Sequence, residues 1–290
     1  MQPSHVDIRE LRTPAPLIDV DIMAGNIGRA VETRRAAGVG YRPHAKTHKI
    51  PALAHRQLLP GAVGITCAKI SEAEVMARRG LRDIFIAYPV MGCGQFHRLA
   101  VLSNSVNLSV GIDSLEVAKA MSQFCTSQGI LFNILLEADT GRRRCGVMPE
   151  SVEEVAEILL TLSGLRLKGI FTHVGQAYLP GPQEQRLALA NQAGQGLADV
   201  GGRLISRGIS IETVSVGSSP GLDAACRVDG VNENRPGTNI FNDCTQVHLS
   251  ACRREDCALT CYCTVVSRTA PDRAIIDGGS KTFSSDRLSD

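Results

Sequence analysis

The sequence contains no tryptophan, and only 4% of its 290 residues are aromatic. Single-stranded nucleic acids are bound largely on aromatic stacking platforms, so this composition argues against such a ligand. An excess of one charge is also missing, because 31 lysines and arginines are balanced by 29 aspartates and glutamates, for a net charge of +2. The chain therefore has no strong electrostatic field to attract nucleic acid or an anionic membrane.

Long apolar runs are missing as well. None approaches the roughly 20 residues that a helix needs to cross a bilayer. The first residues, MQPSHVDIRELRTPAP, lack the apolar core of a secretion signal. We therefore expect a soluble, cytoplasmic protein that binds neither membranes nor nucleic acid.

Cysteine, in contrast, is abundant. The chain has ten cysteines, but no two of them show C-x-x-C spacing, and the closest pair is Cys261 and Cys263. Without a secretion signal a disulfide framework is not expected. We predict free, mostly buried thiols and no metal site built from these residues.

Short, β-branched apolar runs alternate with helical patterns along most of the chain. The runs span residues 38–44, 62–68, 83–89, 106–112, 130–139, 167–174, 209–217 and, less clearly, 227–237. Helical patterns between them include residues 71–80, 113–129, 151–164 and 183–208. Eight strand–helix repeats predict a (β/α)8 TIM-type barrel. A doubly wound sheet is the competing architecture, although it more often uses about five to seven strands.

The ends of these helical patterns carry recognisable signals. Capping-box patterns open three of them: Ser71 with Glu74, Asp113 with Glu116, and Ser151 with Glu154. Glycines stand where helix C-caps are expected, at Gly80, Gly129, Gly164 and Gly208. Both signals support the predicted helix boundaries.

The alternation ends near residue 250. Beyond it, ALTCYCTVVSR and DRAIIDGGS predict two strands separated by PDR, and the chain stops soon afterwards at SSDRLSD. We predict an N-terminal segment (1–22) that pairs with a β-domain, a barrel (23–250), and a truncated C-terminal β-domain (251–290).

Polar and small residues follow several of the predicted strands, where the active groups of a barrel lie. Lys46 follows the first strand, Arg144 the fifth and His173 closes the sixth, while Ser218 and Ser219 follow the seventh and Gly237 and Thr238 the eighth. Small residues with free backbone N–H groups after the last two strands are typical of a phosphate site. A lysine near such a site indicates pyridoxal phosphate (PLP), held as a Schiff base.

Several motifs also resemble a known family: RPHAKTHK, EADTGRRRCGV, VSVGSSPG, RPGTNIFND and TVVSRTAPDRAIIDGGSK. In this order they are similar to the D-threonine aldolase and D-serine dehydratase group of alanine-racemase-like, fold-type III PLP enzymes. The resemblance implies that Lys46 carries PLP and that Arg144 contacts its phenolic oxygen. It also implies a phosphate site at Ser218, Ser219, Gly237 and Thr238, with His173 and Tyr178 in a loop beside the pyridine ring.

Alternatives stay open for the residues around these motifs. His44 and His48 either pack against the lysine or take part in proton chemistry. His173 and Tyr178 are alternatively core groups with backbone partners. Asn239 departs from the family, in which a tyrosine follows the RPGT segment.

The resemblance implies a PLP-dependent lyase that cleaves a D-3-hydroxy amino acid of the D-threonine type to glycine and an aldehyde. A divalent metal (Mn, Mg or Zn) assists this retro-aldol reaction in the family, and we find no ligand motif for it in this sequence. D-serine dehydratase is the alternative enzyme, and a non-catalytic PLP-binding protein is the alternative of another class. The resemblance further implies a homodimer, and the incomplete β-domain predicts a poor catalyst.

Overall fold

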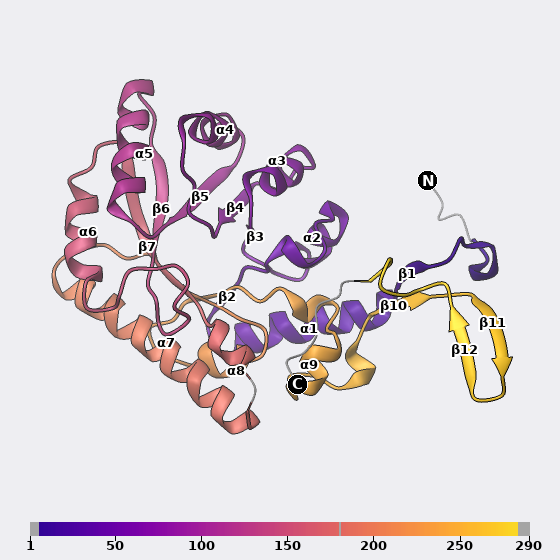
Figure 1. Ribbon diagram of the computed structural model, residues 1–290. Helices are drawn as coiled ribbons and strands as arrows, with labels where there is room; N and C mark the ends of the chain where they lie inside the picture. The colour runs from indigo at the N-terminus through magenta and orange to yellow at the C-terminus, as the bar shows by residue number, and fades with distance from the viewer. Residues whose placement is uncertain (1–5, 180, 284–290) are drawn as a thin grey trace.

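A computed structural model of the chain describes residues 6–179 and 181–283 and places a parallel sheet of eight strands at its centre (Figure 1). These strands are β2 (Gly40–Tyr41), β3 (Ile65–Cys67), β4 (Asp83–Ile86), β5 (Asn107–Ile112), β6 (Phe132–Glu137), β7 (Leu165–His173), β8 (Thr213–Gly217) and β9 (Glu233–Asn234). Their order in the sheet is β2-β9-β8-β7-β6-β5-β4-β3. Each of them falls within or overlaps one of the eight predicted runs.

The first and last strands of this order are joined by backbone hydrogen bonds. Val63 N donates to Tyr41 O at 2.8 Å, and Thr66 N donates to Pro43 O at 2.8 Å. His44 also forms a parallel bridge with Thr66. The sheet therefore curls until its edges meet, which confirms the predicted (β/α)8 barrel and excludes the doubly wound sheet.

Helices alternate with the strands and cover the outside of the sheet (Figure 1). They are α1 (Val20–Ala36), α2 (Pro51–Leu58), α3 (Ile70–Arg78), α4 (Cys93–Ser103), α5 (Leu115–Gln128), α6 (Val152–Leu160), α7 (Gln183–Ser206), α8 (Leu222–Ala225) and α9 (Cys244–His248). In α7 the buried positions Ala190, Ala193, Leu197, Val200 and Leu204 recur at intervals of three and four residues. That spacing gives the helix one continuous apolar face, which packs on the sheet. None of the described helices is long and apolar enough to cross a membrane.

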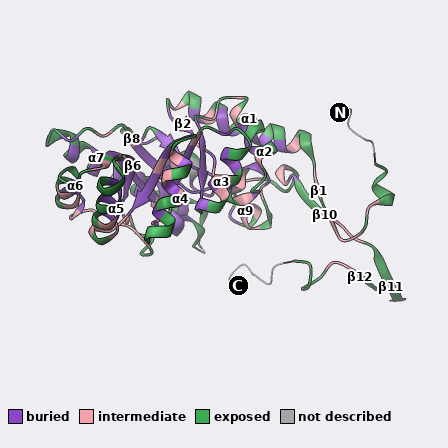
Figure 2. Cartoon of the chain, turned by 90° about the horizontal axis from the view of Figure 1, so that it is seen from above, coloured by how far each residue is buried: buried purple, intermediate pink, exposed green. Residues whose placement is uncertain are grey.

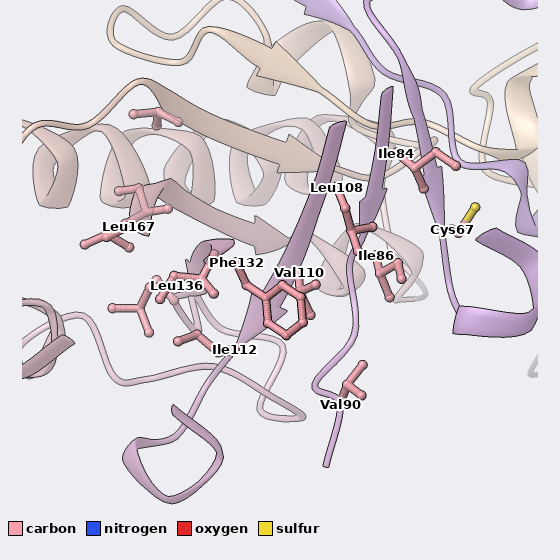
Figure 3. Packing of buried hydrophobic residues seen from close by; sticks show 14 of the residues in the cluster. Cys67, Ile84, Ile86, Val90, Leu108, Val110, Ile112, Phe132, Leu136 and Leu167 are labelled. Atoms are coloured by element: carbon pink, nitrogen blue, oxygen red, sulfur yellow. The ribbon is translucent and has the colours of Figure 1, made fainter. Parts of the chain in front are cut away.

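Side chains of the central strands alternate between two environments. Ile134 and Leu136 of β6 belong to the large cluster between sheet and helices, part of which is shown in Figure 3. Leu135, between them, belongs instead to a small cluster with Phe85 and Phe171. Successive residues of a strand point to opposite faces, so the small cluster fills the barrel interior.

The remaining strands lie outside the barrel. β1 (Ala15–Ile18) pairs antiparallel with β10 (Leu259–Tyr262), while β11 (Val265–Ala270) and β12 (Arg273–Ile276) form a hairpin. The hairpin extends away from the barrel and is largely exposed (Figures 1 and 2). ALTCYCTVVSR was predicted as one strand, but it forms β10 and β11, each with a different partner. The domain boundaries at residues 22 and 250 remain a prediction.

Candidate active site

A cavity of about 380 Å³ opens at the carboxyl ends of the barrel strands. All eight residues predicted from the sequence line it: Lys46, Arg144, His173, Tyr178, Ser218, Ser219, Gly237 and Thr238. They come from the segments after β2, β6, β7, β8 and β9. Parallel strands of a barrel end on one face, so residues far apart in the sequence meet here.

Lys46 lies in a short 3-10 turn, η2 (Ala45–Thr47), beyond the end of β2. His44 caps this turn, because its Nδ1 accepts a hydrogen bond from Lys46 N at 3.4 Å. Lys46 lines the cavity and remains exposed to solvent. Burial, and then the charges of Arg144 and Arg235, lower the pKa of the Lys46 amine. A lysine with a lowered pKa is more often neutral, and hence nucleophilic, at working pH.

The other lysine of the motif, Lys49, is not among the residues that line the cavity. Its Nζ lies 3.6 Å from Glu72 Oε1, and 60% of its side chain is exposed. Its surroundings are those of a solvated surface lysine.

The two histidines of the motif differ in position. His44 lines the cavity, and burial together with the charge of Lys46 holds its pKa well below the ordinary value. His48 lies outside the cavity, where its ring nitrogens contact Gln57 Oε1 at 3.2 Å and Ile50 N at 3.0 Å. The structure therefore brings His44, but not His48, to the candidate site.

His173, at the end of β7, faces the same cavity. Burial, and then the charges of Lys46 and Arg144, lower its pKa to about 3. The imidazole is therefore neutral at physiological pH and can donate one hydrogen bond and accept another.

The segments after β8 and β9 face each other across one wall of the cavity. Ser219 Oγ accepts hydrogen bonds from Thr238 N at 3.1 Å and from Gly237 N at 3.4 Å. Ser218 Oγ is buried and has no hydrogen-bond partner among the described residues. A side chain on Gly237 would crowd this wall, because its Cβ would lie 2.9 Å from Thr47 Oγ1 and 3.2 Å from His44 O. An orphaned hydroxyl beside close backbone N–H groups fits the phosphate of PLP.

Glu137 and Arg235 also line the cavity, and the sequence analysis missed both. Glu137 ends β6 and is 4% exposed, while Arg235 follows β9 and is 5% exposed. The guanidinium of Arg235 lies 5.1 Å from the ring centre of Phe171. The signal in the sequence was a charged residue at the end of an apolar run, since such residues are rarely buried without a purpose. Tyr88 and Cys145 were missed too, and neither carries a comparable signal.

A chain of polar contacts continues from Arg235 into the barrel interior. Arg235 Nη1 donates to Ser215 Oγ, which donates in turn to Glu233 Oε1 at 2.7 Å. Glu233 Oε2 accepts from Arg42 Nε at 2.6 Å, and Arg42 also pairs with Asp83. We call these five residues the interior ion-pair chain. Burial lowers the pKa of Arg235 to about 10, so its charge persists at neutral pH.

The charge of the cavity favours an anionic ligand. Arg144 and Arg235 bring positive charge to its lining, and Glu137 is the only acidic residue among the lining residues described. Within residues 6–179 and 181–283, no group of three His, Cys, Asp or Glu side chains is placed to hold a metal ion. The positively charged lining and the wall after β8 and β9 fit PLP.

Glu137 leads to a prediction about pH. Burial raises the pKa of this carboxyl from 4.5 to about 7, although Arg235 and Arg144 oppose the shift. Because the folded state binds this proton more tightly, the free energy of unfolding falls as pH rises from about 4.5 to about 7, by up to ~3 kcal/mol. Glu137→Gln removes the titration and is expected to stabilise the PLP-free protein at about pH 8 but not at about pH 4.5.

Urea unfolding of the two proteins across this pH range checks the prediction. The titrating histidines are common to both proteins and cancel in the difference. A difference in unfolding free energy that does not change with pH would contradict it.

Comparisons with known proteins agree with this geometry. The family model described as "Alanine racemase, N-terminal domain" matches residues 18–244. A D-threo-3-hydroxyaspartate dehydratase from Delftia sp. (strain HT23) is 36% identical over 280 residues, which are 96% of this chain and 74% of that protein. A D-threonine aldolase from Arthrobacter sp is 31% identical over 275 residues, 93% of this chain and 72% of that protein.

Solved structures give the same picture. The crystal structure of D-threonine aldolase from Filomicrobium marinum matches with a TM-score of 0.89 at 29% identity, over 94% of this chain and 75% of that chain. The Delftia dehydratase matches with a TM-score of 0.90 at 35% identity, over 96% of this chain and 74% of that chain.

Proposed function

The chain belongs to the alanine racemase N-terminal domain family of PLP-dependent enzymes, and we propose that it is a lyase acting on a D-3-hydroxy amino acid. One observation carries the proposal: a lysine with a lowered pKa shares a cavity with two arginines and with a wall of small residues after β8 and β9. The relatives that support it are named as aldolases and dehydratases.

Each of the eight cavity residues predicted from the sequence has a proposed part. Lys46 holds PLP covalently, Ser218, Ser219, Gly237 and Thr238 hold its phosphate, and Arg144 contacts its phenolic oxygen. His173 and Tyr178 lie beside the ring. When bound, PLP supplies an electron sink for the charge that develops on the substrate α-carbon.

Proton transfer is assigned to groups of the chain itself. Burial lowers the pKa of the Lys46 amine, which makes its neutral form, the form that can accept a proton from the substrate, easier to reach. His44 and His173 are neutral in this cavity, so either ring can donate a hydrogen bond to the substrate without adding charge.

We propose retro-aldol cleavage as the reaction, with dehydration as the second candidate because the Delftia relative is a dehydratase. Product analysis separates them. Incubation with PLP, Mn²⁺ and D-threonine yields glycine and acetaldehyde from an aldolase, but 2-oxobutanoate and ammonia from a dehydratase. D-threo-3-hydroxyaspartate yields glycine and glyoxylate in the first case, and oxaloacetate and ammonia in the second. A PLP-loaded protein that forms none of these products would be a cofactor-binding protein.

We further propose that the chain acts as a homodimer. Val265, Val266, Ile275 and Ile276 of the β11–β12 hairpin are all more than two-fifths exposed, between 46% and 59%. Apolar side chains gathered on one hairpin favour burial against a partner. A monomeric mass in sedimentation at micromolar concentration would contradict this.

The proposed phosphate site leads to a prediction about cofactor affinity. We call its residues, Ser218, Ser219, Gly237 and Thr238, the phosphate wall. Gly237→Val is expected to weaken PLP binding about 10- to 100-fold, because the added methyl groups collide with Thr47 and His44. Ser218→Ala removes one hydroxyl and leaves the backbone donors in place, so it is expected to weaken binding less than tenfold. Titration of the PLP-free proteins, followed by the visible absorption of bound PLP, measures both. Equal affinity of the unmodified protein for PLP and for pyridoxal would remove the phosphate site.

A further inference from the structure

A buried chain of hydrogen bonds connects the turn that carries Lys46 with the segment that follows the phosphate wall. It consists of His48, Gln57, Tyr41 and Asn239, and we call these four residues the buried polar chain. Tyr41 and Gln57 are each 1% exposed, and His48 is 9% exposed. None of the four lines the cavity, and the chemistry proposed at Lys46 does not use them.

The buried polar chain begins two residues after Lys46. His48 caps the end of the turn η2, and its Nδ1 accepts a hydrogen bond from Ile50 N at 3.0 Å. Burial lowers the pKa of His48, so its ring is neutral and carries its single proton on Nε2. Nε2 therefore donates to Gln57 Oε1, at 3.2 Å. Because Gln57 belongs to α2, this bond ties the lysine turn to a helix of the barrel.

The other half of the buried polar chain reaches the phosphate wall. Gln57 Nε2 and Asn239 Nδ2 both donate to Tyr41 Oη, each at 3.3 Å. Asn239 lies in the 3-10 turn η4 (Thr238–Ile240), directly after Thr238 of the phosphate wall. The hydroxyl of Tyr41 therefore joins the lysine side of the candidate site to its phosphate side.

Packing supports the same connection. The ring of His48 meets the ring of Phe241 edge to face, with the ring centres 6.4 Å apart. Tyr41, Ile240 and Phe241 belong to one buried cluster, which also contains Leu53 of α2. Close-packed interiors transmit small displacements, so the lysine turn and the phosphate wall cannot shift independently.

We propose that the residues of the buried polar chain are positioning residues, which set the separation between Lys46 and the phosphate wall. The inference rests on the proposed function, because it requires PLP to be held at both places. PLP carries its aldehyde and its phosphate arm on neighbouring carbons of one flat ring, so a wrong separation weakens its binding at one end. Pyridoxal has no phosphate, and its binding at Lys46 does not depend on this separation.

Two near-isosteric substitutions interrupt the buried polar chain. Tyr41→Phe removes the central hydroxyl, and Gln57→Met removes the hydrogen bonds to both His48 and Tyr41. We expect each to weaken PLP binding about fivefold and to change pyridoxal binding less than about twofold. Since both act on one chain, the double variant should bind PLP no more than about tenfold more weakly, instead of the roughly 25-fold of independent effects. Titration of the PLP-free proteins, followed by visible absorption, measures these affinities.

Leu53→Ala is the matched control. Leu53 lies one turn before Gln57 in α2, is 9% exposed and packs in the same cluster as Tyr41. The substitution creates a cavity and should lower the urea midpoint at least as much as Gln57→Met does. It leaves the buried polar chain in place, so the ratio of PLP to pyridoxal affinity is expected to stay within about twofold.

Three results would overturn the inference and leave the proposed function intact. They are an unchanged ratio of PLP to pyridoxal affinity in Tyr41→Phe and Gln57→Met, the same change of that ratio in Leu53→Ala, and fully independent effects in the double variant. If Gln57→Met does not fold, as judged by circular dichroism, Tyr41→Phe compared with Leu53→Ala decides. Equal affinity of the unmodified protein for PLP and pyridoxal would instead remove the phosphate wall, and the inference with it.

Discussion

Lys46→Ala is expected to abolish the visible absorption of covalently held PLP and to lower lyase activity more than about 1,000-fold. The cavity offers no substitute for this amine, because the other lysine of the motif, Lys49, does not line it. The phosphate wall is untouched by the change, so the variant should still bind PLP without a covalent bond. Absorption spectra and product formation measure the two losses, and circular dichroism shows that the variant is folded.

Lys49→Ala is the matched control for this experiment. Its side chain is 60% exposed, its amine is paired with Glu72, and it does not line the cavity. The charge of Glu72 raises the pKa of Lys46 and is the smallest of the causes acting on that amine. Losing the Lys49–Glu72 pair therefore changes only a weak, solvent-screened interaction. Activity within about twofold of the unmodified protein is expected. Loss of the absorption band in Lys49→Ala but not in Lys46→Ala would reassign the cofactor-binding lysine.

The barrel was predictable because its pattern is local and repeated eight times. Alternation of β-branched runs with amphipathic helical patterns requires no knowledge of distant contacts. The glycine helix ends were predictable in three of four cases. Gly129 is the C-cap of α5 with a φ of 64°, in the left-handed region that favours glycine, and Gly80 and Gly208 directly follow the C-cap residues of α3 and α7. The fourth was wrong, because α6 is capped by Thr161 and ends before Gly164.

The capping boxes were less reliable. α3 begins at Ile70, so Ser71 lies inside the helix, and Glu74 pairs with Arg98 instead of a backbone N–H. It is Glu72 that accepts from the backbone, at Ala68 N. Ser114 replaces the expected Asp113 as the cap of α5, and Ser151 makes no side-chain cap bond. Competing partners from neighbouring helices decide such contacts, and a sequence pattern does not contain them.

The residues of the candidate site also fall into some that could be predicted from the sequence and some that could not. Residues that directly follow a strand could be predicted to meet, because the carboxyl ends of parallel strands share one face. Glu137 and Arg235 carried a weaker signal, a charged residue at the end of an apolar run, and their place in the site also depends on which face of the strand they occupy and on closure of the sheet. Arg42 and Glu233 are 191 residues apart and become partners only because β9 is the neighbour of β2.

Glu233→Leu is expected to destabilise the fold by about 3–5 kcal/mol. This is the largest loss of stability that we predict for a single substitution. Glu233 is the centre of the interior ion-pair chain, where it accepts hydrogen bonds from both Arg42 and Ser215. The Glu233 and Arg42 side chains are only 9% and 14% exposed, so water cannot replace the lost carboxylate fully. Removing the Glu233 carboxylate leaves the buried side chains of Arg42 and Arg235 with less negative charge to compensate them. Urea unfolding at neutral pH measures the resulting loss in the free energy of unfolding.

Glu212→Leu removes a carboxylate of similar connectivity from the surface. Glu212 pairs with Arg166 at 2.6 Å and with Lys168 at 3.1 Å, but its side chain is 42% exposed. Solvent screens such pairs, so the expected cost is below about 1 kcal/mol. Similar costs for the two variants would mean that the interior ion-pair chain contributes no more than a surface pair. A larger cost for Glu233→Leu, accompanied by weaker PLP binding, would tie the chain to Arg235 and hence to the floor of the cavity.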